Sequence, residues 1–188
     1  MAALRPAIFQ LKVTLVDSQP PIWRRFLISS LATLEDLHQV LQLVMGWKGA
    51  HLHGFEIDHK HYGDPSPEAL GDDVQNQASV TLAMLTLGVK NKFRYTYDFG
   101  DGWLHQILVE KILTADEIEG PLPRCLKGKR ACPPEDCGGI WGYEDMLSRW
   151  DDPSDPEAIE LIDWIGGDFD PEAFDLAAVN QNLKPLQH

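Results

Sequence analysis

Residues 92–113, which read KFRYTYDFGDGWLHQILVEKIL, carry the strongest β-hairpin signal of the sequence. On both sides of Gly-Asp-Gly, apolar and polar residues alternate with the period of half-buried strands. One face of the first strand carries Phe93, Tyr95, Tyr97 and Phe99, and one face of the second carries Trp103, His105, Ile107 and Val109. Gly100 and Gly102 are expected to supply the positive φ that a tight hairpin loop needs.

Two more strands and one helix are expected before this hairpin. IFQLKVTLV (8–16) alternates in the same way, and SQPP (18–21) separates it from IWRRFLI (22–28), which predicts an antiparallel pair. Thr33 begins a helix with Asp36 as its capping-box partner, and Gly46 ends it. HLHGFEID then predicts a strand with His51, His53, Phe55 and Ile57 on one face. A loop over 62–79 and a short helix or turn over 80–87 follow.

The chain after Leu113 has a different character. A segment rich in Cys, Pro and Gly covers 121–142, and helices are expected over 143–150, over 155–165 with Ser154 as cap, and from Asp170 to about Leu183. We therefore predict a single α+β domain over 1–188. Its core (8–113) is an antiparallel or mixed sheet with an N-terminal helix packed on it. The remainder (114–188) is a Cys/Pro/Gly loop followed by a mostly helical, acidic C-terminal portion.

The charge and hydropathy of the chain argue against nucleic acid and membranes as partners. The net charge is −13, and residues 113–188 hold 17 acidic side chains against 6 basic ones. Such a surface repels phosphate backbones, so direct nucleic-acid binding is disfavoured. No apolar run of 18 residues exists, so no membrane span is expected. The N-terminus reads as a strand rather than a signal peptide, and we expect a cytoplasmic protein.

The three cysteines, Cys125, Cys132 and Cys137, form the first candidate metal site. Their odd number and tight clustering argue against a secreted disulfide framework. The four-residue gap between Cys132 and Cys137 is compatible with zinc, although a histidine from the strands would have to complete the site. The alternative is that the thiols pack as small apolar groups in a loop braced by prolines.

Histidines and carboxylates form the second candidate site. His51 and His53 are two apart on a predicted strand, so both should point the same way and share one metal ion or anionic ligand. His105 lies close in sequence to Asp98 and Asp101 at the hairpin tip. If these strands are neighbours, the histidines and a carboxylate could hold a metal that activates water. The alternative is that each ring makes a structural hydrogen bond at the sheet.

PPED (133–136) contributes two adjacent carboxylates, Glu135 and Asp136. On regular backbone they would diverge, and turn capping is the expected use of Asp136. Phosphate-binding loops, dinucleotide fingerprints, H-E-x-x-H and nucleophile elbows are all missing from the sequence. The sequence thus offers no nucleophile or cofactor motif, and whether the chain is an enzyme stays open.

Taken together, several stretches resemble the plasmid Ri ORF-three-like family, whose uncharacterised members are carried on plasmids, mobile elements and many prokaryotic chromosomes. They are PPIWRRF (20–26), TLEDLHQVLQ (33–42), MGWKGAHLHGFEI (45–57), FRYTYDFGDGWLHQI (93–107), CLKGKRACPPEDCGGIWGY (125–143) and GGDFDPEAFD (166–175). The resemblance implies an α+β fold without an established activity. By position, it points to His51, His53, Tyr97, Asp98, Asp101, Trp103 and His105 as lining any site, followed by the cysteine loop with Glu135 and Asp136.

Three hypotheses about function follow. The first is a binding or accessory module, associated with plasmids or mobile elements, that holds a protein or a small ligand with the hairpin tip and the Cys/PPED loop. The second is a metal-dependent hydrolase, with zinc as a possible cofactor and His51, His53, His105 and an aspartate as ligands. The third is a nucleic-acid-associated factor that uses Arg24, Arg25, Arg94 and the basic residues of 124–130, and the charge balance ranks it last.

Overall fold

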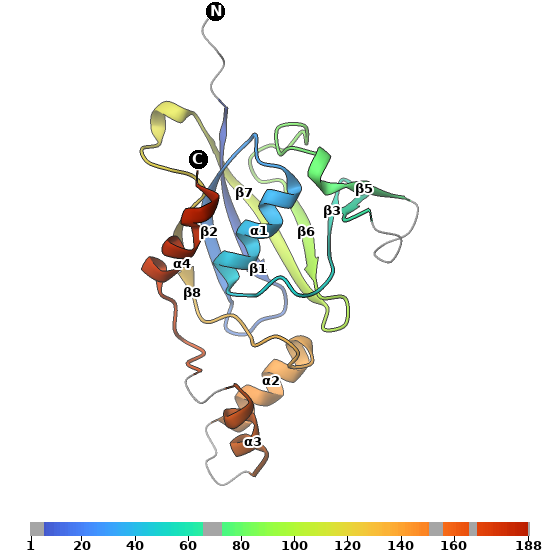
Figure 1. Cartoon of the computed structure of the whole chain (residues 1–188), viewed down its shortest axis with the longest axis vertical. Coiled ribbons are helices and arrows are strands. Elements are labelled where there is room, and N and C mark those ends of the chain that lie inside the picture. The colour runs from blue at the N-terminus through green and yellow to red at the C-terminus, as the bar shows by residue number, and fades with distance from the viewer. Residues whose placement is uncertain (1–5, 66–72, 151–155, 166–168, 188) are drawn as a thin grey trace, which may run out of the picture.

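The computed structural model of the chain describes residues 6–65, 73–150, 156–165 and 169–187, and centres on one eight-stranded mixed sheet (Figure 1). The strand order is β5-β4-β3-β6-β7-β1-β2-β8. Neighbouring strands are antiparallel except the parallel pair β4 and β5. The strands are β1 Ile8–Leu15, β2 Trp23–Ser29, β3 His53–Ile57, β4 Lys60–Gly63, β5 Val74–Asn76, β6 Lys92–Tyr97, β7 Trp103–Leu113 and β8 Arg124–Lys129. The α+β prediction with an antiparallel or mixed sheet is confirmed.

The predicted hairpin is β6 and β7, whose register pairs Tyr97 with Trp103 and Tyr95 with His105. These four side chains are at most 1% exposed, because the inward positions of a two-residue period face the core. The connecting loop takes its positive φ angles at Asp98 (54°) and Gly102 (67°) rather than at Gly100. The expectation for Gly100 is therefore corrected. The residue that adopts the left-handed backbone in its place is Asp98.

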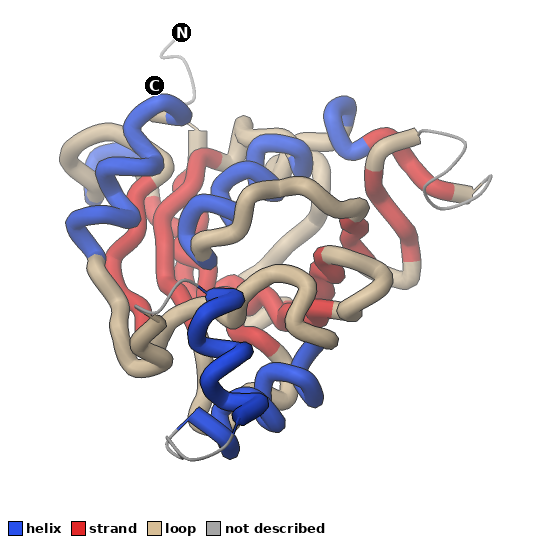
Figure 2. Tube along the Cα trace, turned by 60° about the horizontal axis from the view of Figure 1, so that its bottom comes forward, coloured by secondary structure: helices blue, strands red, loops and turns tan. Residues whose placement is uncertain are grey.

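Helix α1, Leu34–Met45, lies over one face of the sheet in both views (Figure 1, Figure 2). Thr33 and Asp36 form the predicted capping box, and Gly46 ends the helix in the left-handed region with φ 110°. Its apolar stripe includes Leu37, Leu41 and Val44, all 0% exposed. Burying one such side chain contributes about 1.5–3 kcal/mol, so this stripe fixes α1 against the sheet.

Strand β8 lies in a part of the chain where only loop and helices were expected. Its Cys125 pairs with Phe26 of β2, so the first cysteine belongs to the sheet. Asn180 covers this edge: its Oδ1 accepts from the Cys125 amide (2.9 Å) and its Nδ2 donates to the Cys125 carbonyl (3.0 Å). A short edge strand covered by a helix leaves fewer unpaired backbone groups. The pattern missed it because Gly128 and three cations interrupt the apolar alternation.

Three short helices follow, α2 Gly139–Trp150, α3 Pro156–Ile165 and α4 Leu176–Leu183. The helix predicted from Asp170 begins later, because the side chain of Asp175 caps the amides of Ala177 and Ala178. The Ser154 cap lies outside the described residues. Helices α2 and α3 extend from the end of the sheet that carries the β6–β7 loop (Figure 1). Within the described residues, no helix has the length and apolar character needed to cross a membrane.

Candidate metal centre

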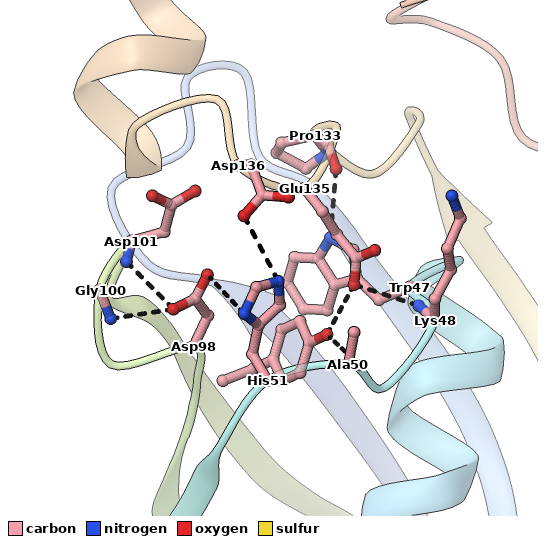
Figure 3. A network of polar contacts seen from close by, with 11 residues as sticks. Trp47, Lys48, Ala50, His51, Asp98, Gly100, Asp101, Pro133, Glu135 and Asp136 are labelled. Carbon is pink, nitrogen blue, oxygen red and sulfur yellow. Dashed lines mark hydrogen bonds and ion pairs between the residues drawn. The ribbon is translucent and has the colours of Figure 1, made fainter.

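The loop between β6 and β7 presents Asp98 to the segment that precedes β3. The amide of Asp98 donates to the Leu52 carbonyl at 2.8 Å, which ties the two segments together. Asp98 Oδ1 accepts hydrogen bonds from the amides of Gly100 (2.9 Å) and Asp101 (3.4 Å). The amides of the loop thus fix Asp98 Oδ1. The other oxygen, Asp98 Oδ2, lies 3.7 Å from His51 Nδ1 (Figure 3).

A second carboxylate approaches the other side of the His51 ring. Asp136 Oδ1 lies 3.4 Å from His51 Nε2, so the imidazole lies between two aspartates (Figure 3). The side chain of Asp98 is 11% exposed, that of His51 30% and that of Asp136 68%. The arrangement therefore has a buried, fixed side at Asp98 and an accessible side at Asp136.

Glu135 anchors the loop that delivers Asp136. Its Oε1 atom accepts from the Tyr97 hydroxyl at 2.6 Å and from the Lys48 amide at 3.2 Å. Burial, followed by the bond to the Glu135 carboxylate, raises the pKa of the Tyr97 phenol, so the phenol keeps the proton that it donates. Glu135 is consequently an internal anchor, whereas the side chain of Asp136 stays largely exposed.

One further contact places the PPED loop (residues 132–139) beside the segment that precedes His51. The Trp47 indole donates to the Pro133 carbonyl at 3.1 Å. Asp136 adopts a left-handed backbone with φ 61°, so the pair does not lie on regular backbone. Glu135 contacts Tyr97 and Asp136 faces His51, and these two rings are neighbours with centroids 5.8 Å apart. The turn-capping role expected for Asp136 is not observed, because in the described part of the chain its carboxylate faces His51.

Glycines let the PPED loop approach the hairpin tip. A Cβ at Gly139, where φ is 68°, would lie 2.3 Å from the Asp101 carbonyl oxygen. A Cβ at Gly142 would lie 1.9 Å from the Cys137 carbonyl oxygen. Neither distance is compatible with a side chain. The Oδ2 atom of Asp101 is also buried here, and it accepts no hydrogen bond from the described residues.

The donor atoms of His51, Asp98 and Asp136 all lie within 4.8 Å of one another, and they form a group that could hold a metal ion. Ligand atoms arranged tetrahedrally around one zinc ion, each at about 2.0–2.2 Å, lie roughly 3.3–3.6 Å apart. The two carboxylates face different nitrogens of the His51 ring, so an ion bound through one nitrogen requires the exposed Asp136 to move closer to Asp98 on that side. Three protein ligands leave at least one coordination position open.

His53 belongs to a different environment, contrary to the prediction that it shares a face with His51. Strand β3 begins only at His53, so the alternation of a strand does not relate the two rings. The His53 ring stacks on His38 with centroids 3.4 Å apart and an interplanar angle of 2°. His53 Nε2 lies 2.9 Å from Gln77 Oε1, and His38 Nδ1 lies 2.8 Å from the Tyr95 hydroxyl. Burial lowers the pKa of both imidazoles, that of His38 to about 3.

His105 and Trp103 lie inside the core instead of lining the candidate centre. His105 is 0% exposed; its Nδ1 lies 3.3 Å from the Tyr95 carbonyl, and its ring is edge-on to Trp47 at 5.0 Å. Burial lowers its pKa to about 4. Of the histidines expected to hold a hydrolytic metal, only His51 joins a metal-ligand group in the described chain.

The cysteines also fail to assemble as a zinc site. Cys125 Sγ donates to the Arg25 carbonyl at 3.5 Å, and Cys137 Sγ lies 3.9 Å from the Gly139 carbonyl oxygen. Burial raises the pKa of all three thiols, that of Cys137 to about 12. Among the described residues, no metal-ligand group includes a cysteine.

Comparisons with known proteins agree with the motifs. The chain matches the plasmid pRiA4b ORF-3-like protein family over residues 7–178. It belongs to this family. Uncharacterized protein y4hQ of Sinorhizobium fredii is 37% identical over 183 residues, which are 96% of this chain and 92% of that protein. The crystal structure of a protein of unknown function, MM3350 from Methanosarcina mazei Go1, is similar with a TM-score of 0.83 and 37% identity, over 92% of this chain and 97% of that one.

The segments that carried the family resemblance meet at the candidate centre. Residues 45–57 supply Trp47 and His51, residues 93–107 supply Asp98, and residues 125–143 supply Asp136. Sequence reasoning placed the histidine and cysteine constellations in separate sites and did not single out Trp47 or Lys48 for this one. The adjacency of aromatic and glycine residues in MGWKG was the available signal, but only tertiary contacts pair it with the PPED loop.

Proposed function

We propose that this member of the family is a metal-binding module that holds one divalent transition-metal ion through His51, Asp98 and Asp136. The observation that carries the proposal is the convergence of these donors from three separate segments to within 4.8 Å. An imidazole nitrogen with two carboxylate oxygens suits zinc or manganese better than magnesium or calcium, which prefer oxygen alone. Zinc is the first ion to test.

The surroundings of the three ligands support the same proposal. Asp98 is oriented by two loop amides through Oδ1, and Asp136 is held by the anchor at Glu135. Partners of this kind, outside the ligands themselves, orient metal ligands in proteins. Asp101 adds a further carboxylate on the same loop as Asp98, and neighbouring carboxylates attract a cation.

Isothermal titration of the untagged protein with zinc, and separately with manganese, tests the proposal. One site per chain is expected in the wild-type protein. His51→Ala and Asp98→Asn should each weaken binding by about tenfold or more, which is about 1.4 kcal/mol. His61→Ala is the matched control, because His61 is exposed on β4 and outside the ligand group. Equal affinity in all four proteins, or no binding in the wild type, would refute the site.

A metal-dependent hydrolase remains the second candidate, now on a different ligand set. It is favoured by the ligand count: catalytic zinc sites use three protein ligands and keep a position for water, whereas structural sites use four. Hydrolysis of a simple phosphodiester such as bis(p-nitrophenyl) phosphate, measured with and without zinc, separates the candidates. Zinc-dependent turnover that Asp98→Asn abolishes would favour the enzyme, and metal binding without turnover would favour the binding module.

Three of the basic residues considered for nucleic acid have partners within the protein, and one of them is buried. Arg24 is 2% exposed, and its Nε donates to the Val44 carbonyl at 2.7 Å. Arg25 pairs with Glu110 through Nη2 at 2.7 Å, and Arg94 lies 3.5 Å from Glu56. These pairings add to the argument from net charge against a nucleic-acid-associated role.

A further inference from the structure

A cavity lies at the end of the sheet opposite to the candidate metal centre. Strand β7 runs from Trp103 at the hairpin tip to Leu113, and the cavity lies beyond the Leu113 end, between α1, the strands β1 and β2, and the loop that follows β7. Its volume is about 480 Å³, within the range of small-molecule sites in proteins. Much of the wall is aliphatic, from Ile8, Ile28, Val40, Ile118, Leu122 and Leu186.

Asp36 is the one ionisable side chain among the described residues that line this cavity. Its Oδ2 atom accepts hydrogen bonds from the amide and the hydroxyl of Thr33, both at 2.8 Å, in the capping box of α1. No hydrogen bond from the described residues reaches Oδ1. One carboxylate oxygen is therefore fixed in place by the cap, and the other keeps its acceptor capacity on a residue that lines the cavity.

The wall formed by the 115–123 loop adds negative charge around the cavity. It carries Asp116, Glu117 and Glu119 between the lining residues. Two cations lie near this loop without lining the cavity: Lys111 acts electrostatically on Glu117, and Arg124 Nη1 donates to the Glu119 carbonyl at 2.7 Å. Because Asp36 is the charged group that lines the described wall, it favours a cationic ligand over an anionic one.

We infer that the cavity binds an aliphatic organic cation, a primary alkylamine whose hydrocarbon chain lies between α1 and the 115–123 loop and whose ammonium group contacts Asp36 Oδ1. The apolar wall supplies the affinity, because burying each methylene contributes to binding. The carboxylate supplies the preference for a cation, since its hydrogen bond to an ammonium group is charge-assisted. This site is independent of the proposed metal centre.

Calorimetric titration with octylamine, octanol and octanoate, each below its micelle concentration, tests the inference. Octylamine should bind at one saturable site, octanol about tenfold more weakly and octanoate more weakly still. Asp36→Asn, which keeps an oxygen for the Thr33 cap, should remove the preference for the amine over the alcohol. Octanoate that binds as tightly as octylamine would overturn the inference, and so would an amine preference that persists in Asp36→Asn.

A second variant locates the ligand. Ala115→Trp places a large side chain on the half-buried wall of the cavity and should abolish octylamine binding. The thermal unfolding midpoint and the zinc affinity of each variant show whether the fold is retained. Amide chemical shifts of the wild-type protein locate the ligand without any substitution. Addition of octylamine should shift the amide signals of Val40 and Ile118, which line the cavity. Shifts confined to other regions would contradict the assigned cavity.

Discussion

His51 and His53 are two residues apart, yet they belong to two chemically different regions. His51 lies between the carboxylates of Asp98 and Asp136 near the surface. His53 is stacked on His38 and bonded to Gln77, in a cluster with aromatic neighbours. The difference shows that a histidine becomes a candidate ligand through the charges around it and its access to solvent, rather than through its position in a motif.

The buried environment of His38 and His53 favours the neutral form of both imidazoles. Desolvation penalises the charged form of each ring, and for His38 the proximity of His53 adds like-charge repulsion. His105 shows the same response to burial. These three rings therefore act as structural side chains, whereas the ring of His51 is the one that carboxylates surround.

The largest expected effect comes from truncating the buried region. His105→Ala leaves a cavity in the core and removes the partner of the Tyr95 carbonyl, so the free energy of unfolding should fall by about 3 kcal/mol. Urea denaturation followed by tryptophan fluorescence measures the change. Zinc affinity of the folded variant should match the wild type. A large loss of zinc binding with unchanged stability would place His105 at the metal centre. It would contradict the distinction between His51 and the buried histidines.

The pH dependence of stability is the next largest effect. Because the folded pKa values of His38, His53 and His105 lie below their unfolded value, the unfolded chain binds more protons in acid. Their stabilising contribution is complete above about pH 6.5 and is lost as the pH falls towards the folded pKa, near 4 for His105. For His105 alone the loss between pH 6.5 and 5 is about 1.5 kcal/mol. Denaturant midpoints across this range measure it.

A matched variant sharpens this test. His53→Gln removes one of the titrating rings, so the slope of stability against pH between 6.5 and 5 should become shallower, while zinc affinity stays unchanged. An unchanged slope in this variant would show that His53 does not titrate with a lowered pKa.

The smallest expected effect on stability comes from removing the hydrogen bond between Tyr97 and Glu135, which anchors the PPED loop. Tyr97→Phe removes the hydrogen bond to Glu135 but keeps the buried ring, so zinc affinity should fall by about tenfold, since neighbours that orient metal ligands have effects of this size. The free energy of unfolding should fall by only about 1 kcal/mol. Titration with zinc and urea denaturation measure the two quantities. Unchanged zinc affinity would show that the Glu135 anchor does not position Asp136.

Local patterns predicted the elements whose determinants are close in sequence. The two-residue alternation of 92–113 placed Tyr95, Tyr97, Trp103 and His105 on the inward faces, and the Thr33–Asp36 pair marked the start of α1. Strand β8 was missed because its pairing with β2, not its own pattern, makes it a strand.

The candidate centre depended on contacts between distant segments. Whether β3 begins at His51 or His53 is decided by where the hairpin tip contacts the preceding segment, as in the bond from the Asp98 amide to Leu52. The separate partners of Glu135 and Asp136 depend on the Trp47–Pro133 contact and the left-handed backbone of Asp136. Neither is encoded by residue spacing.

Anomalous X-ray scattering at the zinc edge, from crystals grown with zinc, tests the central claim most directly. A single strong peak within about 2.0–2.2 Å of His51, Asp98 Oδ2 and Asp136 Oδ1 is the result expected. A peak bound by Cys132 and Cys137, one beside His53 or His105, or no ordered peak at saturating zinc would contradict the assignment of this centre.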